Sequence, residues 1–99
     1  MKILVTSVEK CEDAKKLSLI LVKSKLAACA TYFPAKSAYF WKGKLVDSCE
    51  YIVEFKCDEK KASAAKKLIE KSHPYFVPMV YSISPSAVSS KYSKWLKSH

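Results

Sequence analysis

The sequence predicts an α+β fold of the split βαβ, or ferredoxin-like, type. Three observations predict it. Strand-like and helix-like runs follow one another in the order β-α-β-β-α-β. The two central strands are long and are joined through the only glycine of the chain, Gly43, and one further helix-like run closes the chain. We expect two helices to cover one face of a four-stranded antiparallel sheet.

The chain begins with a strand and a helix. Ile3 to Thr6 is a short apolar run, which is typical of a buried strand. The acidic residues that follow favour a helix N-terminus through the helix dipole; they are Glu9, Glu12 and Asp13. Apolar residues then recur at helical spacing, at Ala14, Leu17 and Leu21. We expect this helix to end near Ser24 and Lys25.

A long hairpin forms the middle of the chain. Cys29 to Trp41 is rich in aromatic residues and indicates an extended strand, and Gly43 marks the turn. The return strand alternates. One face carries Tyr51, Val53, Phe55 and Cys57; the other carries Glu50, Ile52, Glu54 and Lys56.

The length of this hairpin predicts an overhang. A strand of about 13 residues spans roughly 43 Å at about 3.3 Å per residue, whereas a domain of this size has a radius of gyration of about 13 Å. We expect Pro34 to place a bulge or bend in the strand. Exposed aromatic residues at the tip, Tyr39, Phe40 and Trp41, need a partner, and a second copy of the chain is the simplest one.

The last third of the chain supplies the remaining elements. Asp58 is the expected N-cap of a second helix, whose apolar stripe is Ala62, Ala65 and Ile69. Two prolines make residues 73–78 a stiff corner. Met79 to Ile83 indicates a fourth strand, and a short helix carries Tyr92, Trp95 and Leu96. The sequence has no linker, so we expect one domain over residues 1–99.

Composition excludes several functions. The net charge is +9, every basic residue is lysine, and arginine, asparagine and glutamine are absent. Acylphosphatases of this fold need arginine and asparagine, and sequence-specific nucleic-acid readers rely on the same side chains. The third strand also lacks the glycine of RNA-recognition domains. We expect no specific nucleic acid as a partner. Weak RNA binding through the sheet and the lysine excess stays a further hypothesis, and loss of all binding at physiological salt would mark it as nonspecific.

The sequence also bears on location and on the cysteines. No apolar stretch is long enough to cross a membrane, and the N-terminal run is too short for a signal peptide. We therefore expect a cytoplasmic protein without membrane insertion.

The cysteines are Cys11, Cys29, Cys49 and Cys57, with no C-x-x-C pair, so we expect free, buried thiols rather than a zinc site.

The sequence shows no Ser-His-Asp or Cys-His arrangement at a recognisable spacing, and we expect the protein not to be an enzyme. His73 suits acid–base chemistry or a packed, capping role, and the second role is more frequent. The metal donors that the sequence offers are His73, the four thiols, Glu50, Glu54 and Met79. Soft sulfur donors together with imidazole would suit copper.

Motifs along nearly the whole chain are similar to those of one family. They are Leu26-Ala27-Ala28-Cys29, Pro34, Ser37, Tyr39, Trp41, Gly43, Glu50, Lys56, His73-Pro74-Tyr75, Pro78, Tyr92, Trp95 and Leu96. In their order and spacing they resemble the CutA family, named for divalent-cation tolerance. This chain departs from the family pattern at four positions, which are Phe76, Met79, Val5 and Ser72. Of the metal ligands that the family pattern suggests, only His73 remains.

The resemblance implies a homotrimer similar to the P-II signalling proteins, with Tyr39, Trp41 and Trp95 between subunits. It implies clefts between subunits lined by Glu50, Lys56, His73 and Tyr75. It also implies binding of copper (Cu²⁺) or another divalent cation, with His73 as the best ligand and Cys29 as an alternative. A second hypothesis is a non-enzymatic signalling or scaffold trimer. Its clefts would bind a small anion or nucleotide, with Lys56 as the charge partner.

Overall fold

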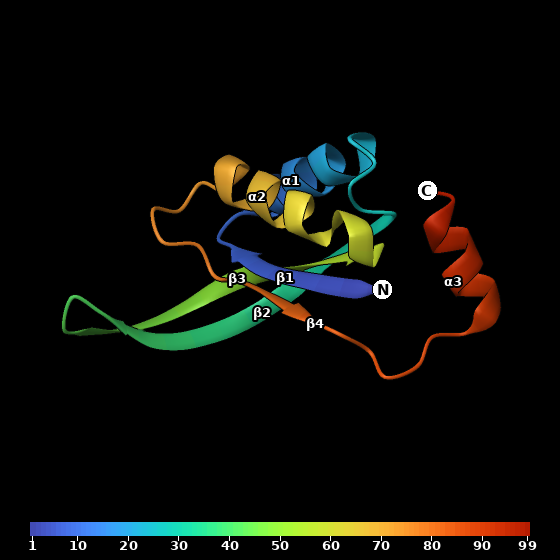
Figure 1. The fold of residues 1–99 in the computed structure, drawn as a ribbon. Coiled ribbons are helices and arrows are strands. Elements are labelled where there is room, and N and C mark those ends of the chain that lie inside the picture. Colours follow the sequence, from blue (N-terminus) through green and yellow to red (C-terminus); the bar gives the residue numbers. More distant parts are fainter.

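The computed structural model describes residues 1–99 and confirms the predicted α+β, ferredoxin-like order (Figure 1). The strands are β1 (Lys2–Val8), β2 (Cys29–Trp41), β3 (Lys44–Cys57) and β4 (Val80–Ile83). The helices are α1 (Cys11–Lys23), the 3-10 turn η1 (Glu59–Lys61), α2 (Ala62–Ser72) and α3 (Ser90–Lys97). All neighbouring strands pair antiparallel, in the order β2-β3-β1-β4. None of the helices is long and apolar enough to cross a membrane.

The core lies between the sheet and the two longer helices. Helices α1 and α2 lie over one face of the sheet, whereas α3 stands apart near the opposite end from the hairpin tip (Figure 1). The alternation predicted for β3 is confirmed, because Val53, Phe55 and Cys57 are fully buried. Their face also carries Leu4, which is the register partner of Phe55 on β1. Burial of this apolar face against the helices is the main stabilising contribution of the fold.

Helix α1 ends in a Schellman motif. The N–H of Leu26 donates to the carbonyl of Leu21 (3.2 Å), and the N–H of Lys25 donates to that of Val22 (3.0 Å). This motif requires a left-handed residue after the helix, and Lys25 occupies that position with φ 62°. The predicted end of the helix near Ser24 and Lys25 agrees with this geometry, although the position lacks the usual glycine.

The central hairpin extends beyond the helices, as its length predicts (Figure 1). The molecule measures 46 × 26 × 20 Å along its principal axes. Lys42 (φ 51°) and Gly43 (φ 77°) form the two-residue turn, and two positive φ angles are typical of a type I′ turn. At the tip, Phe40 is 73% exposed and Trp41 is 51% exposed. The tip therefore presents apolar surface that its own chain does not cover.

The predicted bulge at Pro34 is wrong. Strands β2 and β3 pair without interruption from Cys29 opposite Lys56 to Trp41 opposite Lys44, and Pro34 lies opposite Tyr51 in that register. The physical reason is the position of β2 at the edge of the sheet. A proline there can turn the side that lacks an N–H away from the ladder, so no extra residue is needed.

Three other expectations require correction. Asp58 precedes η1, but its side chain makes no capping hydrogen bond, and α2 begins only at Ala62. The first strand is longer than its apolar run, because β1 is central and pairs on both sides. All four thiols are free, but only Cys57 is buried; Cys29 is half-buried, and Cys11 and Cys49 are exposed.

Candidate functional site

A groove of about 740 Å³ lies between the outer part of the hairpin and the corner, residues 73–78. Its apolar lining consists of Tyr39, Trp41, Val46, Tyr75, Phe76, Val77 and Met79. Its polar lining consists of Ser7, Glu9, Ser37, Ser48 and Glu50. We call it the Glu50 groove, since Glu50 is its most buried charged residue.

Strand geometry explains why these hairpin residues share one surface. Val46, Ser48 and Glu50 alternate along β3, so their side chains point to the same face. Tyr39 lies opposite Val46, and Ser37 lies opposite Ser48 in the ladder. Beyond Tyr51, the partner of Val8, β3 has no further neighbour from β1. The corner covers this part of the hairpin instead and completes the groove.

Glu50 and Tyr75 meet inside the groove. Glu50 is only 8% exposed, and the Tyr75 hydroxyl donates a hydrogen bond to its Oε2 across 3.2 Å. Burial raises the pKa of Tyr75, and the neighbouring Glu50 carboxylate raises it further. The phenol therefore stays protonated and remains a donor. The other carboxylate oxygen, Oε1, accepts no hydrogen bond within the chain and is open to a ligand.

His73 lies next to Tyr75, and both of its ring nitrogens make hydrogen bonds to backbone groups. Its Nε2 lies 2.8 Å from the carbonyl oxygen of Ser7, which can only accept, so Nε2 carries the proton. Its Nδ1 accepts the N–H of Tyr75 across 3.0 Å. Burial lowers the pKa of His73, which keeps the ring neutral. His73 is thus the buried residue that ends α2 and fixes the start of the corner.

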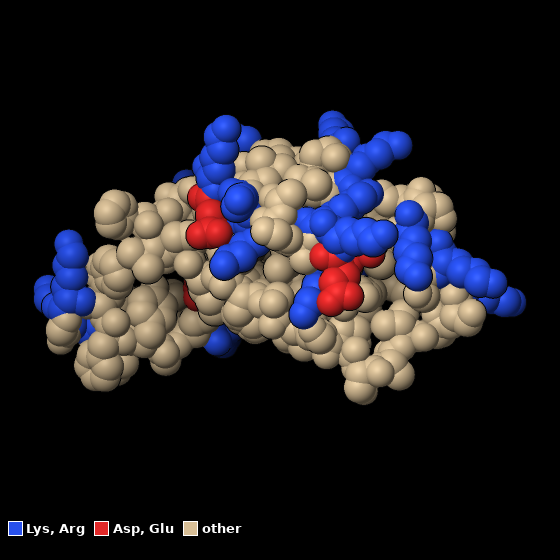
Figure 2. Space-filling model, viewed as in Figure 1, with Lys and Arg blue, Asp and Glu red and all other residues tan.

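The charge of the groove is opposite to that of the chain. Glu9 and Glu50 are its only charged lining residues, although the chain carries +9 overall. Figure 2 shows lysine side chains spread over the helical layer, the hairpin tip and the end near α3, not gathered in one patch. The groove is therefore a locally acidic surface in a basic protein.

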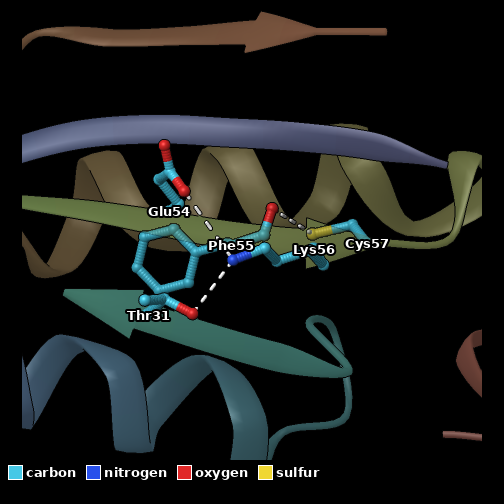
Figure 3. Close-up of polar contacts among 5 residues, drawn as sticks. All are labelled: Thr31, Glu54, Phe55, Lys56 and Cys57. Atoms are coloured by element: carbon cyan, nitrogen blue, oxygen red, sulfur yellow. Dashed lines mark hydrogen bonds and ion pairs between the residues drawn. The ribbon is translucent and has the colours of Figure 1, made fainter. Parts of the chain in front are cut away.

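Lys56 and Cys29 lie outside this groove within one chain. They are register partners near the far end of β2 and β3 from the turn. The Lys56 ammonium donates to Thr31 Oγ1 (3.0 Å) and lies 3.7 Å from Glu54 Oε1 (Figure 3). Of the residues expected to line one cleft, a single chain brings Glu50, Tyr75 and His73 together and leaves Lys56 and Cys29 apart.

A single chain does not bring together enough side chains to form a complete metal site. No group of three or more His, Cys, Asp or Glu side chains converges anywhere in the structure. Glu50 and Met79 line the same groove, so one carboxylate and one thioether face a common space. Burial raises the pKa of Cys57 to about 11, which keeps this thiol protonated and unsuited to metal binding. A full ligand set would need further donors, from water or from a second copy of the chain.

Sequence reasoning missed several groove residues. Ser37 and Ser48 are register partners, and their alternation with Tyr39 and Glu50 was the available signal. Glu9, Phe76 and Val77 reach the groove from other parts of the chain. No local pattern reports that approach, because the groove joins segments that are distant in the sequence.

Comparison with known proteins gives a consistent result. The family model described as CutA1 divalent ion tolerance protein matches residues 2–99. The divalent-cation tolerance protein CutA of Thermotoga maritima is 31% identical over 87% of this chain and 85% of its own length. That of Pyrococcus horikoshii is 33% identical over 97% of this chain and 94% of its own.

Comparison with solved structures supports the same family. The structure of CutA from Synechococcus elongatus superposes with a TM-score of 0.95 at 31% identity and covers 98% of this chain and 87% of that one. The match extends over the sheet, both covering helices and the C-terminal helix, since nearly the whole chain is included. This chain therefore belongs to the CutA1 divalent ion tolerance protein family.

Proposed function

We propose that this protein acts in divalent-cation tolerance as a non-enzymatic, cytoplasmic homotrimer that binds a divalent cation, with copper among the ions it takes. The observation that carries the proposal is the acidic Glu50 groove in a chain of net charge +9. A buried carboxylate with one free oxygen favours a cation strongly, because little water is present to screen the attraction. The free thiols are typical of a reducing compartment.

Glu50 is the first ligand in this proposal. Its Oε1 is free to coordinate while Oε2 stays bonded to Tyr75. Met79 adds a soft thioether in the same groove, which suits copper better than magnesium or calcium. His73 could coordinate only after losing a hydrogen bond to Ser7 or Tyr75. His73 and Cys29 therefore stay predicted ligands that variants must test.

Support for the proposed trimer comes from apolar surface that one chain leaves uncovered. On the sheet face away from the helices, Tyr81 and Ile83 are each 46% exposed. Ile83 lies beside the half-buried Ile3 in the ladder, whereas Tyr81 lies beside Val5, which is already buried. The exposed hairpin tip adds to this surface. Extended apolar surface of this kind marks an interface. A copy of the same chain would cover it and would supply the donors that one chain lacks.

The same observations argue against the anion or nucleotide hypothesis. No lysine lines the groove, and the ammonium of Lys56 is engaged by Thr31 and Glu54. Glu50 and Glu9 would repel a phosphate that entered. An anion would have to bind elsewhere, at a surface built from more than one chain.

Calorimetry with Cu²⁺, on protein first stripped with a chelator, tests the metal proposal. We expect Glu50→Gln to weaken binding by more than about tenfold, because it removes a carboxylate ligand. Glu54→Gln is the matched control, since Glu54 lies on the same strand outside the groove. Equal Cu²⁺ affinities of these two variants would remove Glu50 from the site. The Cu²⁺ affinities of His73→Ala and Cys29→Ser show whether His73 and Cys29 are ligands.

The trimer is tested separately, by sedimentation equilibrium of the purified protein.

A further inference from the structure

A second cavity, of about 260 Å³, lies in the helical layer, where α1 runs beside the end of α2. We call it the α2-end cavity. It shares no lining residue with the Glu50 groove. The helices cover the face of the sheet opposite to the apolar face that the proposed trimer buries (Figure 1). The residues that line the cavity are Asp13, Lys16, Leu17, Ile20, Ser72 and Pro74.

Helix α2 ends in this cavity without a cap. Backbone N–H groups that follow α1 and α3 donate to carbonyls in the last turns of those helices. No N–H that follows α2 does so, and Pro74 has no N–H to donate. The carbonyls of residues 69–72 therefore accept no hydrogen bond from the chain beyond the helix. Such carbonyls are normally satisfied by side chains, water or a ligand.

The charges around the uncapped carbonyls favour a cation. The C-terminal end of a helix carries partial negative charge, and Asp13 adds a carboxylate from α1. The Asp13 side chain is half-buried and forms no ion pair, since the single ion pair of the chain joins Lys56 and Glu54. Burial lowers the pKa of His73, the residue that follows α2, and the Asp13 carboxylate opposes that effect. The carboxylate therefore acts at the end of α2.

We propose that the α2-end cavity binds a monovalent alkali-metal cation through the Asp13 carboxylate, the Ser72 hydroxyl and the carbonyl oxygens at the end of α2. This site is separate from the proposed copper site and takes a different class of ion. All of its donors are oxygen atoms, which suit hard cations better than copper. Carbonyl oxygens at the C-terminal ends of helices are known to coordinate sodium ions in other proteins.

The charge and the size of the cavity favour a monovalent ion over a divalent one. Only one carboxylate lines the cavity, and the ammonium of Lys16 on the same lining repels a doubly charged ion about twice as strongly. The volume of about 260 Å³ holds about eight water molecules at about 30 Å³ each. A cation therefore enters together with water molecules, which complete its coordination.

The test replaces choline chloride by KCl at constant ionic strength. Binding is followed by NMR of the full-length ¹⁵N-labelled protein in its native oligomer, with a chelator of divalent ions present throughout. Choline is the control cation because its methyl groups prevent direct coordination by oxygen donors. We expect the amides of Asp13, Lys16, Ser72 and His73 to shift with a saturating dependence on K⁺. A parallel series with NaCl shows which of the two ions the cavity prefers. No saturable shift of these amides with either ion overturns the proposal.

Variants identify the donors. Asp13→Asn should weaken K⁺ binding by about tenfold, because it removes the charge of the carboxylate. Glu12→Gln is the matched control, since Glu12 is the exposed neighbour of Asp13 on α1 and lies outside the cavity. Lys16→Gln should strengthen binding, because it removes a competing positive charge.

The proposal is contradicted if K⁺ affinity is the same in the wild type and Asp13→Asn, or if Glu12→Gln weakens it equally. Should Asp13→Asn fail to fold, Ser72→Ala provides the same comparison, because it removes a different donor of the site. Cu²⁺ affinity should be unchanged in these variants. The alkali-metal site and the proposed copper site therefore stand or fall separately.

Discussion

The hydroxyl of Tyr75 donates a hydrogen bond to Glu50 Oε2 across 3.2 Å and so ties the corner to the central hairpin. The two residues are 25 positions apart in the sequence and come from opposite walls of the groove. His73 supports this contact, because its Nδ1 accepts the N–H of Tyr75 and fixes the backbone of that residue. Ser7, His73, Tyr75 and Glu50 thus form one connected set of hydrogen bonds.

Removal of the Tyr75 hydroxyl should destabilise the protein. Tyr75→Phe leaves the Glu50 carboxylate without its donor, and we expect the free energy of unfolding to fall by about 1 kcal/mol. Urea denaturation followed by circular dichroism measures the change. Tyr51→Phe is the control, because the Tyr51 hydroxyl makes no hydrogen bond within the chain and the residue is half-buried. A loss of equal size in both variants would contradict a specific role for the Tyr75 contact.

Acidification should destabilise the protein through His73. Burial lowers the pKa of His73 in the folded state, so the unfolded chain binds a proton more readily near the ordinary value of 6.5. The free energy of unfolding should therefore decrease as the pH falls below 6.5 toward the folded-state pKa. Denaturation curves at pH 7.5 and 5.5 measure the slope. His73→Gln should flatten it, whereas His99→Gln should not, because His99 is exposed at the terminus.

The four thiols should differ in reactivity. Thiolates are the reactive form, and burial raises the pKa of Cys57 to about 11 while the fold shields the sulfur. A thiol-specific disulfide reagent at pH 8 should modify the exposed Cys11 and Cys49 first and Cys57 only on unfolding. Cys57→Ser should remove the slowest phase alone. Rapid modification of all four thiols in the native protein would show that the sheet opens readily at β3.

Replacement of Lys25 by glycine should stabilise the protein. Lys25 has φ 62°, a conformation that costs a residue with a Cβ about 1 kcal/mol and costs glycine almost nothing. Lys25→Gly keeps the backbone carbonyl that accepts from the Lys61 ammonium, so that contact survives. The opposite sign is expected for Lys23→Gly, because Lys23 lies within α1. Thermal denaturation of the two variants provides the comparison.

Sequence patterns predicted the fold well where they report on local geometry. The alternation of Val53, Phe55 and Cys57 identified the buried face of β3, because successive side chains of a strand point to opposite faces. Gly43 identified the turn, since positive φ favours glycine. The sequence did not predict the unbroken ladder at Pro34, because the tolerance for proline depends on the edge position of β2.

The structure divides the site residues predicted from the sequence between two places. Glu50, Tyr75 and His73 were singled out and lie together, whereas Lys56 and Cys29 lie elsewhere on the sheet. Motif order alone could not separate these two groups, because residues of one motif set can occupy opposite ends of a long strand. Glu9 carried no signal of its own and became relevant only through its place in the groove.

The sequence by itself determined the order of the elements, the buried face of the sheet, the turn of the hairpin and the overhang, since all of these follow from backbone geometry and apolar periodicity. Only the tertiary structure decided which side chains meet. It placed the corner against the hairpin and buried Glu50 beneath Tyr75. It also engaged both ring nitrogens of His73. The physical reason is that these contacts join segments distant in sequence, and packing of the whole sheet and its helices sets their distances.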